Sequence, residues 1–157
     1  MAGLVEICKL ESSLSSVQID LLGQLSPCLP FVADLTRANL RLYVPSKTAG
    51  THIMAFEVSP GMSASIHGES TPAILTDRTV EPMVKETFRT GKALNQWQES
   101  ETDGAGIRSY AITDYSGTTI GVAVLSFRLL LPMDEYTHLL HVAGTLLRCG
   151  RKFSPEV

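Results

Sequence analysis

The chain has 157 residues, of which 44% are hydrophobic and 18% are charged, and its formal net charge is −3 at pH 7. This length and composition are typical of one globular domain with a core of its own. The charge argues against a nucleic-acid partner, which would call for a basic face, and no apolar run approaches the roughly 18 residues that a membrane span needs.

The first predicted elements are two helices. The N-terminus has a short apolar run, but this run contains an acidic residue and lacks the basic region of a signal peptide, so we expect a cytoplasmic protein. Leucine and valine residues at helical spacing predict a helix over 13–25, with Ser12 or Ser13 as its N-cap. A second helix over 27–37 tolerates Pro27 at its first position, where the missing amide hydrogen costs nothing.

Alternating apolar and polar residues then predict an antiparallel hairpin. Residues 39–44 and 51–58 both alternate, and residues 45–50 supply the turn between them. Apolar residues on every second position indicate that each strand has one buried face. In the second strand this face would include both His52 and Phe56.

The middle of the chain is an irregular segment followed by a helix. Residues 59–78 are rich in Ser, Gly, Pro and Thr, which predicts a loop with one short extended piece at 64–67. A helix is predicted over 81–91, with Pro82 at its first position. A short strand follows over 93–98.

The clearest pattern lies near the C-terminus. Residues 107–130 predict two long strands joined by an Asp-Tyr-Ser-Gly turn, and a last helix follows over 132–149. The apolar face of this helix is wider than packing on one sheet requires, so we expect a second partner, either the N-terminal helix or a sister subunit. The order of elements predicts an α+β fold, with a mostly antiparallel sheet of about five to six strands flanked by N- and C-terminal helices.

Five short segments, taken in their order and spacing, resemble those of a known protein family. They are 32–35 with 38–43, the strand that ends before Pro60, 63–67 (SASIH), 81–84 (EPMV) with 90–91, and 120–125 (IGVAVL). Together they resemble the N-terminal GAF-type sensor domain of cytoplasmic bacterial histidine kinases, which a PAS domain and a kinase module normally follow. The resemblance implies one GAF-like sensor domain over 1–150, with 151–157 as a tail or the start of a linker.

The resemblance also implies a function. The chain contains neither the phosphoacceptor-histidine helix nor the glycine-rich ATP lid of the full kinases. We therefore expect a ligand-sensing regulatory domain of a two-component histidine kinase, without catalytic activity or a cofactor of its own. It would bind an unidentified small molecule and form a homodimer through its terminal helices. The alternative is a dimerisation or protein-interaction module without a small-molecule ligand.

In a GAF-like fold the hairpin and the irregular segment line the ligand cavity. Arg108 could hold a carboxylate or phosphate in a two-pronged contact, and Trp97 could stack on a flat ring. Alternatively, His52 is a half-buried strand residue, Trp97 belongs to the core and Arg108 is a solvated charge. The residues that we expect to contact a ligand are His52, Phe56, Ser65, His67, Trp97, Arg108 and Tyr110.

The sequence favours neither a catalytic nor a metal site. His138 and His141 lie three residues apart on the last helix, but they belong to its polar face, so solvated surface is the better interpretation. No nucleophile elbow accompanies the histidines. The cysteines are odd in number and contain no C-x-x-C pair, which indicates reduced thiols rather than a zinc site or a disulfide framework. The three cysteines are Cys8, Cys28 and Cys149.

Overall fold

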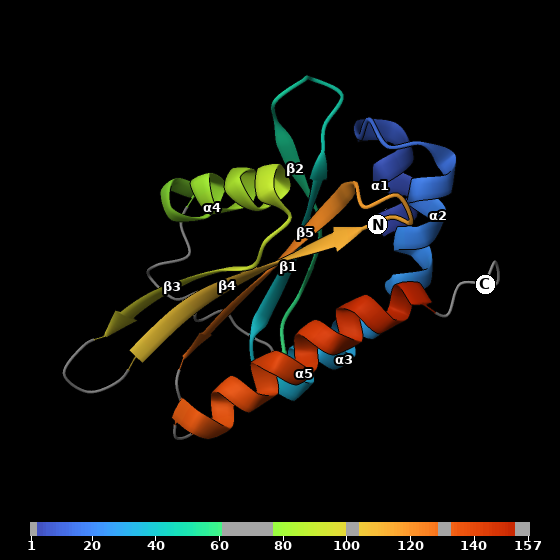
Figure 1. Ribbon diagram of the computed structural model, residues 1–157. Helices are drawn as coiled ribbons and strands as arrows, with labels where there is room; N and C mark the ends of the chain where they lie inside the picture. The colour runs from blue at the N-terminus through green and yellow to red at the C-terminus, as the bar shows by residue number, and fades with distance from the viewer. Residues whose placement is uncertain (1–2, 61–76, 100–103, 129–132, 153–157) are drawn as a thin grey trace.

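The computed structural model describes residues 3–60, 77–99, 104–128 and 133–152. The elements follow in the order α1 (Leu4–Glu11), α2 (Ser16–Leu25), α3 (Cys28–Thr36), β1 (Asn39–Pro45), β2 (His52–Val58), α4 (Asp77–Thr90), β3 (Leu94–Glu99), β4 (Gly104–Thr113), β5 (Thr119–Arg128) and α5 (Met133–Lys152). The strands form one antiparallel sheet in the order β2-β1-β5-β4-β3 (Figure 1). The predicted fold, an antiparallel sheet flanked by helices from both ends of the chain, is confirmed.

Helices cover both faces of the sheet. The helix α4 lies on one face, and α1, α2, α3 and α5 lie on the other (Figure 1). The larger core forms beneath this second group, where Leu40, Leu42 and Leu125 of the sheet meet Leu22 and Leu29 of α2 and α3. All five side chains are fully buried. Because buried apolar surface is the main favourable contribution to folding, this layer is the principal source of the domain's stability.

The helix α4 forms a smaller core with the opposite face of the sheet. Met83 and Val84 pack against Ile107, Val122 and Val124. The helix begins at Asp77, before the predicted start at residue 81, and Pro82 therefore lies inside it. Proline inside a helix removes a backbone hydrogen bond and costs about 3 kcal/mol, which is why the sequence favoured a start at the proline. The apolar contacts of α4 with the sheet offset this cost.

The N-terminal helices also differ from the prediction. The short apolar run at the start of the chain forms α1, which the sequence did not predict. The N-cap of α2 is Ser15, whose Oγ accepts a hydrogen bond from the backbone N–H of Gln18 at 3.2 Å. Ser12 and Ser13 were the predicted caps. Ser12 is instead engaged at the end of α1, since its hydroxyl donates to the Cys8 carbonyl at 2.7 Å.

An irregularity in the hairpin changes which side chains share a face. The register of β1 and β2 shifts between Leu42 and Tyr43, so that Phe56 pairs with Leu42 and Met54 pairs with Tyr43. A bulge of this kind reverses the side on which the following residues lie. The prediction that His52 and Phe56 share one buried face is therefore wrong. The short extended piece expected at 64–67 lies outside the described residues.

The last helix finds a second packing partner within the chain. The helix α5 packs on α3 and, less extensively, on α2, and it touches the sheet at β4. Tyr136 and Leu147 are buried in the larger core, and Leu139 and Leu146 are partly buried against it. The N-terminal helices thus cover much of the wide apolar face of α5. Within the described part of the chain, no helix is both long and apolar enough to cross a membrane.

Candidate functional site

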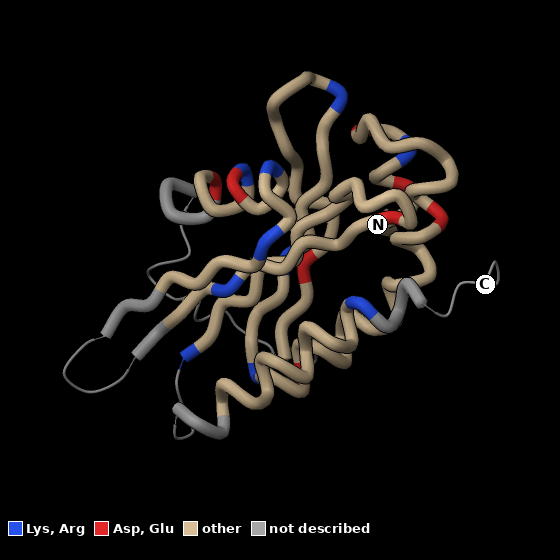
Figure 2. The backbone as a smooth tube through the Cα atoms, viewed as in Figure 1, with Lys and Arg blue, Asp and Glu red and all other residues tan. Residues whose placement is uncertain are grey.

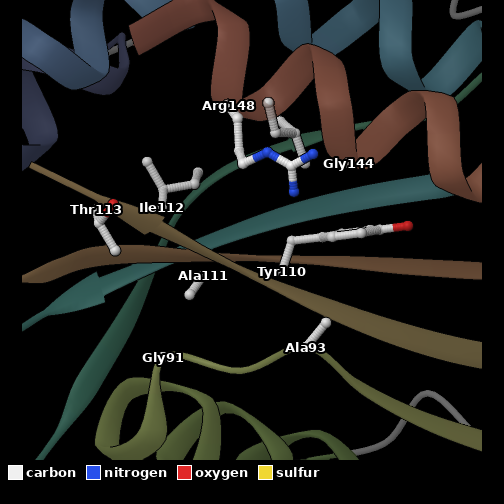
Figure 3. A pocket seen from close by; sticks show the side chains of 9 residues that line it. Gly91, Ala93, Tyr110, Ala111, Ile112, Thr113, Gly144 and Arg148 are labelled. Atoms are coloured by element: carbon white, nitrogen blue, oxygen red, sulfur yellow. The ribbon is translucent and has the colours of Figure 1, made fainter. Parts of the chain in front are cut away.

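Two clefts lie between α5 and the edge of the sheet formed by β3 and β4, within the described residues. One has a volume of about 210 Å³ and the other of about 290 Å³. The smaller, which we call the Arg148 cleft, is lined by Gly91, Ala93, Tyr110, Ala111, Ile112, Thr113, Gly144, Leu147 and Arg148 (Figure 3). The larger, which we call the Arg108 cleft, is lined by Asn95, Gln96, Ile107, Arg108, Phe127, Thr137, Leu140 and His141.

Tyr110 of β4 bridges the sheet and α5 between the two clefts. Its hydroxyl donates to the carbonyl of Leu140 at 2.7 Å, and only 8% of the residue is exposed. Gly144 makes this close approach possible, because a Cβ at that position would lie 3.0 Å from Cε1 of the tyrosine ring. Burial raises the pKa of Tyr110, and the neighbouring Arg108 guanidinium partly offsets that effect. The phenol therefore stays protonated at neutral pH and acts as a donor.

Arg108 lies two residues before Tyr110 on the same face of β4. Strand pairing sets it opposite Asn95 of β3, and its NH1 donates to the Asn95 Oδ1 at 2.6 Å. The carbon of its guanidinium lies 5.2 Å from the centroid of the Tyr110 ring, which is a cation–π distance. Its Nε is buried and has no hydrogen-bond partner among the described residues. Asn95 and the Tyr110 ring therefore hold the guanidinium, and its Nε–H has no hydrogen-bond partner among the described residues.

The Arg148 cleft takes its charge from α5. Figure 3 shows the Arg148 side chain reaching down from the helix toward β4, where Tyr110 and Ile112 lie. The part of α5 that is not grey in Figure 2 runs from Tyr136 to Arg148. Arg148 is the one Lys, Arg, Asp or Glu residue in this stretch. The residue is exposed, so its guanidinium is less firmly placed than that of Arg108.

His52 lies on the other face of the sheet. Its ring stacks on Phe88 of α4, with centroids 4.3 Å apart and an interplanar angle of 7°. Burial lowers the pKa of His52, Lys85 lowers it further, and Glu81 opposes both effects. The imidazole is therefore neutral at pH 7 and packs as an aromatic ring against the helix.

The structure brings only part of the predicted ligand site together. Arg108 and Tyr110 are neighbours beneath α5, whereas His52 faces α4. Phe56 lies on the α5 side but packs into the larger core from β2, which β1 and β5 separate from β4. Arg108, Tyr110, His52 and Phe56 therefore do not line one common cavity. Trp97 lies in β3 opposite Gly106, but the structure does not describe its side chain. The predicted contacts that lie wholly outside the described residues are Ser65 and His67.

Sequence reasoning missed the contribution of α5 to the clefts. Thr137, His141 and Gly144 line them, whereas the prediction placed the cavity beside residues 59–78. His141 is exposed, as predicted, but it also borders the larger cleft. A glycine in the middle of an amphipathic helix was the available signal. Glycine costs about 1 kcal/mol there relative to alanine, and its presence often marks a close contact.

The described residues do not gather metal ligands. No three His, Cys, Asp or Glu side chains among them lie close enough together to hold a metal ion. Cys8 and Cys28 are free thiols, and burial raises the pKa of the Cys8 thiol. A raised pKa lowers the thiolate fraction, so this cysteine is poorly suited to redox or nucleophilic chemistry.

Comparison with solved structures shows the same fold in the sensor region of a histidine kinase and in transcriptional regulators. The sensor region of a sensor histidine kinase has a TM-score of 0.57 and 16% sequence identity, over 97% of this chain and 54% of that chain. An IclR homologue from Microbacterium sp. strain HM58-2 has a TM-score of 0.51 and 12% identity, over 89% of this chain and 70% of that chain. The transcriptional regulator YaiJ has a TM-score of 0.50 and 8% identity, over 87% of this chain and 97% of that chain. At these identities the likeness concerns the fold alone.

Comparisons of sequence identify the family. The chain spans about half the length of the sensor histidine kinase structure. A search of curated proteins finds no match to the chain. The family described as "Histidine kinase PdtaS, GAF domain" matches residues 4–130, which include every element from α1 to β5. This match covers most of the chain and confirms the resemblance found in the sequence. The chain therefore belongs to the family of histidine kinase PdtaS GAF domains.

Proposed function

We propose that this domain is the ligand-sensing input module of a cytoplasmic two-component histidine kinase, without catalytic activity of its own, and that its ligand binds beneath α5. One observation carries the proposal: both clefts have the sheet as one wall and α5 as the other. A molecule in either cleft contacts a fixed element and a terminal helix at once. This arrangement suits a sensor, because occupancy of the cleft and position of the helix depend on each other.

Among the described residues, two tyrosine hydroxyls hold α5 against the rest of the domain. Tyr110 donates to the carbonyl of Leu140, and Tyr136 donates to the carbonyl of Thr36 in α3 at 2.6 Å. A ligand that fits one position of the helix better than another shifts the population toward that position. Because α5 also packs on α3 and α2, a shift of α5 is passed to the N-terminal helices. The signal would leave the domain through this group of helices.

A ligand screen followed by hydrogen exchange tests the proposal. Thermal unfolding of the 157-residue chain is measured with nucleotides, cyclic dinucleotides, amino acids and neutral and anionic metabolites. We expect at least one compound to raise the melting temperature and to slow amide exchange in α5 between Tyr136 and Arg148. Exchange in α4 between Met83 and Thr90 is the internal control and should change little. The proposal fails if no compound shifts the melting temperature, or if every compound that does protects α4 and leaves α5 unchanged.

Exposed apolar side chains favour a second candidate, a dimerisation module without a ligand. Leu10 of α1, Val17 of α2 and Phe31 of α3 are 65%, 64% and 57% exposed. Large apolar side chains at the surface mark contact sites when they form a patch. These three belong to the N-terminal helices, which this candidate uses as its dimer contact. In this candidate the clefts beneath α5 stay empty, and the ligand screen gives no hit.

A further inference from the structure

We infer that the Arg108 cleft binds a small organic anion, with its carboxylate or phosphate head on the Arg108 guanidinium and its apolar body against Phe127 and Leu140. The inference rests on the proposed function, because it names the chemical class of the ligand that the domain senses. It also places that ligand on the face of the sheet opposite α4.

The guanidinium of Arg108 is held in a fixed orientation before any ligand binds. Asn95 accepts from its NH1, and its carbon lies over the Tyr110 ring, so two contacts fix its orientation. Its Nε is buried and lacks a partner among the described residues. Because Nε is buried, a ligand in the cleft would be bound by the terminal nitrogens of the guanidinium. A side chain that is already oriented loses little freedom when it binds a carboxylate or phosphate.

The charge around the cleft favours an anion. None of the described residues that line it is acidic, and Arg108 is the charged group among them. Arg108 has no ion pair within the described part of the chain, whereas Arg41 on β1 is paired with Glu57. Thr137 and His141 of α5 add polar groups on the opposite wall. An anion held by Arg108 would thus be able to contact the helix as well as the sheet.

The size and the walls of the cleft call for more than an inorganic ion. Its volume of about 290 Å³ lies at the lower end of the range of small-molecule sites. Phe127 and Leu140 give the cleft an apolar side, which inorganic phosphate alone would leave uncovered. A small aromatic or branched acid would occupy both the charged end of the cleft at Arg108 and its apolar side. The Arg148 cleft is smaller, and its arginine is exposed, so it is the weaker candidate.

Calorimetric titration of the whole chain with matched probes tests the inference. The probes are benzoate, phenyl phosphate, the neutral isostere benzamide and inorganic phosphate. Inorganic phosphate has the anionic group but no apolar part. We expect benzoate or phenyl phosphate to bind at least about tenfold more tightly than benzamide, since a charge-assisted contact is roughly twice as strong as a neutral one. The ratio between benzoate and phenyl phosphate tells which head the cleft prefers. Inorganic phosphate should bind more weakly than either.

Variants assign the binding to Arg108. Arg108→Gln should weaken the anionic probes by at least about tenfold, and Arg108→Lys should have an intermediate effect because it keeps the charge but loses the planar fork. Arg148→Gln, at the other cleft, is the matched control and should bind as the parent chain does. Thermal unfolding of each variant checks that it is folded, and benzamide binding checks that the cleft is intact.

The outcomes separate this inference from the proposed function. If neither anion binds more tightly than benzamide, or if Arg108→Gln leaves their binding unchanged, the anion site is overturned. Sensing beneath α5 still stands in that case, provided that another compound of the screen raises the melting temperature and protects α5. If no compound of either experiment binds, the sensing proposal falls together with the anion site.

Discussion

Two tyrosine hydroxyls set the position of the last helix. The hydroxyl of Tyr110 ties α5 to β4 through Leu140, and that of Tyr136 ties it to α3 through Thr36. Phe127 tilts against the Tyr136 ring with centroids 4.6 Å apart, so the second tyrosine is also held by aromatic packing. Each hydroxyl joins one side chain to one backbone carbonyl. Removing single oxygen atoms therefore probes the attachment of α5 without creating a large cavity.

The Tyr110→Phe substitution should lower the free energy of unfolding by about 1 kcal/mol, the usual net value of one hydrogen bond. Amide exchange in α5 near Leu140 should become faster, because the ring stays in place while the tie to the helix is lost. Urea denaturation and hydrogen exchange provide the two measurements. Tyr136→Phe is the matched control, since it releases α5 from α3 instead of from β4. Unchanged stability and exchange in Tyr110→Phe would show that this hydrogen bond does not hold the helix.

The same two phenols make the domain sensitive to alkali. Burial raises the pKa of both Tyr110 and Tyr136, and the negative charge that Tyr110 would carry raises that of Tyr136 further. The unfolded chain loses these protons near the ordinary tyrosine pKa of about 10, before the folded chain does. The stabilisation is thus fully present below pH 10 and is lost as the pH rises above it.

Urea midpoints measured from neutral pH to about pH 11 should therefore fall more steeply for the parent chain than for the Tyr110→Phe/Tyr136→Phe double variant. Tyr115→Phe removes an exposed tyrosine and should follow the parent chain. Parallel curves for the parent and the double variant would contradict the assignment.

At the scale of elements, the contact between α5 and β4 depends on the absence of a side chain. A Cβ at Gly144 would lie 3.0 Å from the Tyr110 ring, closer than nearly all such contacts in proteins. Alanine favours the helix by about 1 kcal/mol over glycine, but overpacking a tight contact costs about 1–3 kcal/mol. The second effect should win while the tyrosine ring is present.

A double-mutant cycle separates the two effects. Gly144→Ala should destabilise the parent chain by up to about 2 kcal/mol. In a Tyr110→Leu background, where the ring no longer blocks the Cβ, the same change should stabilise the chain relative to Tyr110→Leu alone. Both energies come from urea denaturation. Equal effects in the two backgrounds would mean that the glycine serves another purpose.

Local patterns in the sequence predicted some elements well because their causes are local. The turn between β4 and β5 is an example: Asp114 Oδ1 accepts from the backbone N–H groups of Ser116 and Thr118, and Gly117 has a φ of 92°. These are properties of adjacent residues. Strand alternation likewise predicted that Arg108 and Tyr110 lie on one face of β4.

Other features could not be predicted because their causes are distant in the sequence. The bulge opposite Leu42 and Tyr43 leaves no mark in the alternation of residues 51–58, so His52 was assigned to the wrong face. The start of α4 before Pro82 depends on its packing against the sheet. Periodicity also predicted that α5 is amphipathic, but only the positions of α2 and α3 decide which part of its face remains uncovered beside β4.

At the scale of the molecule, the helices of the two chain ends form one layer, and the outer side of this layer determines whether the domain self-associates. Val17 and Phe31 are exposed on it. If the homodimer forms there, sedimentation at micromolar concentration should show a dimer for the parent chain. Val17→Glu and Phe31→Glu should shift the chain toward monomer, since a charge at an apolar contact is costly. Met54→Glu, at an exposed apolar position of β2, is the control and should leave the dimer intact. A monomeric parent chain would contradict both the homodimer and the dimerisation candidate.

The strand order has a consequence for synthesis of the domain on the ribosome. The last strand of the sheet along the chain, β5, lies between β1 and β4 at its centre. Until it emerges, the β1–β2 hairpin and the β3–β4 hairpin have no common neighbour, and an isolated hairpin is only marginally stable in water. The sheet therefore closes late, through pairings between residues far apart in the sequence, which is a slow route to the native state. The inner edge of β1 therefore stays unpaired from its own synthesis until β5 emerges, and insertion of β5 pairs the edges of β1 and β4 in one step.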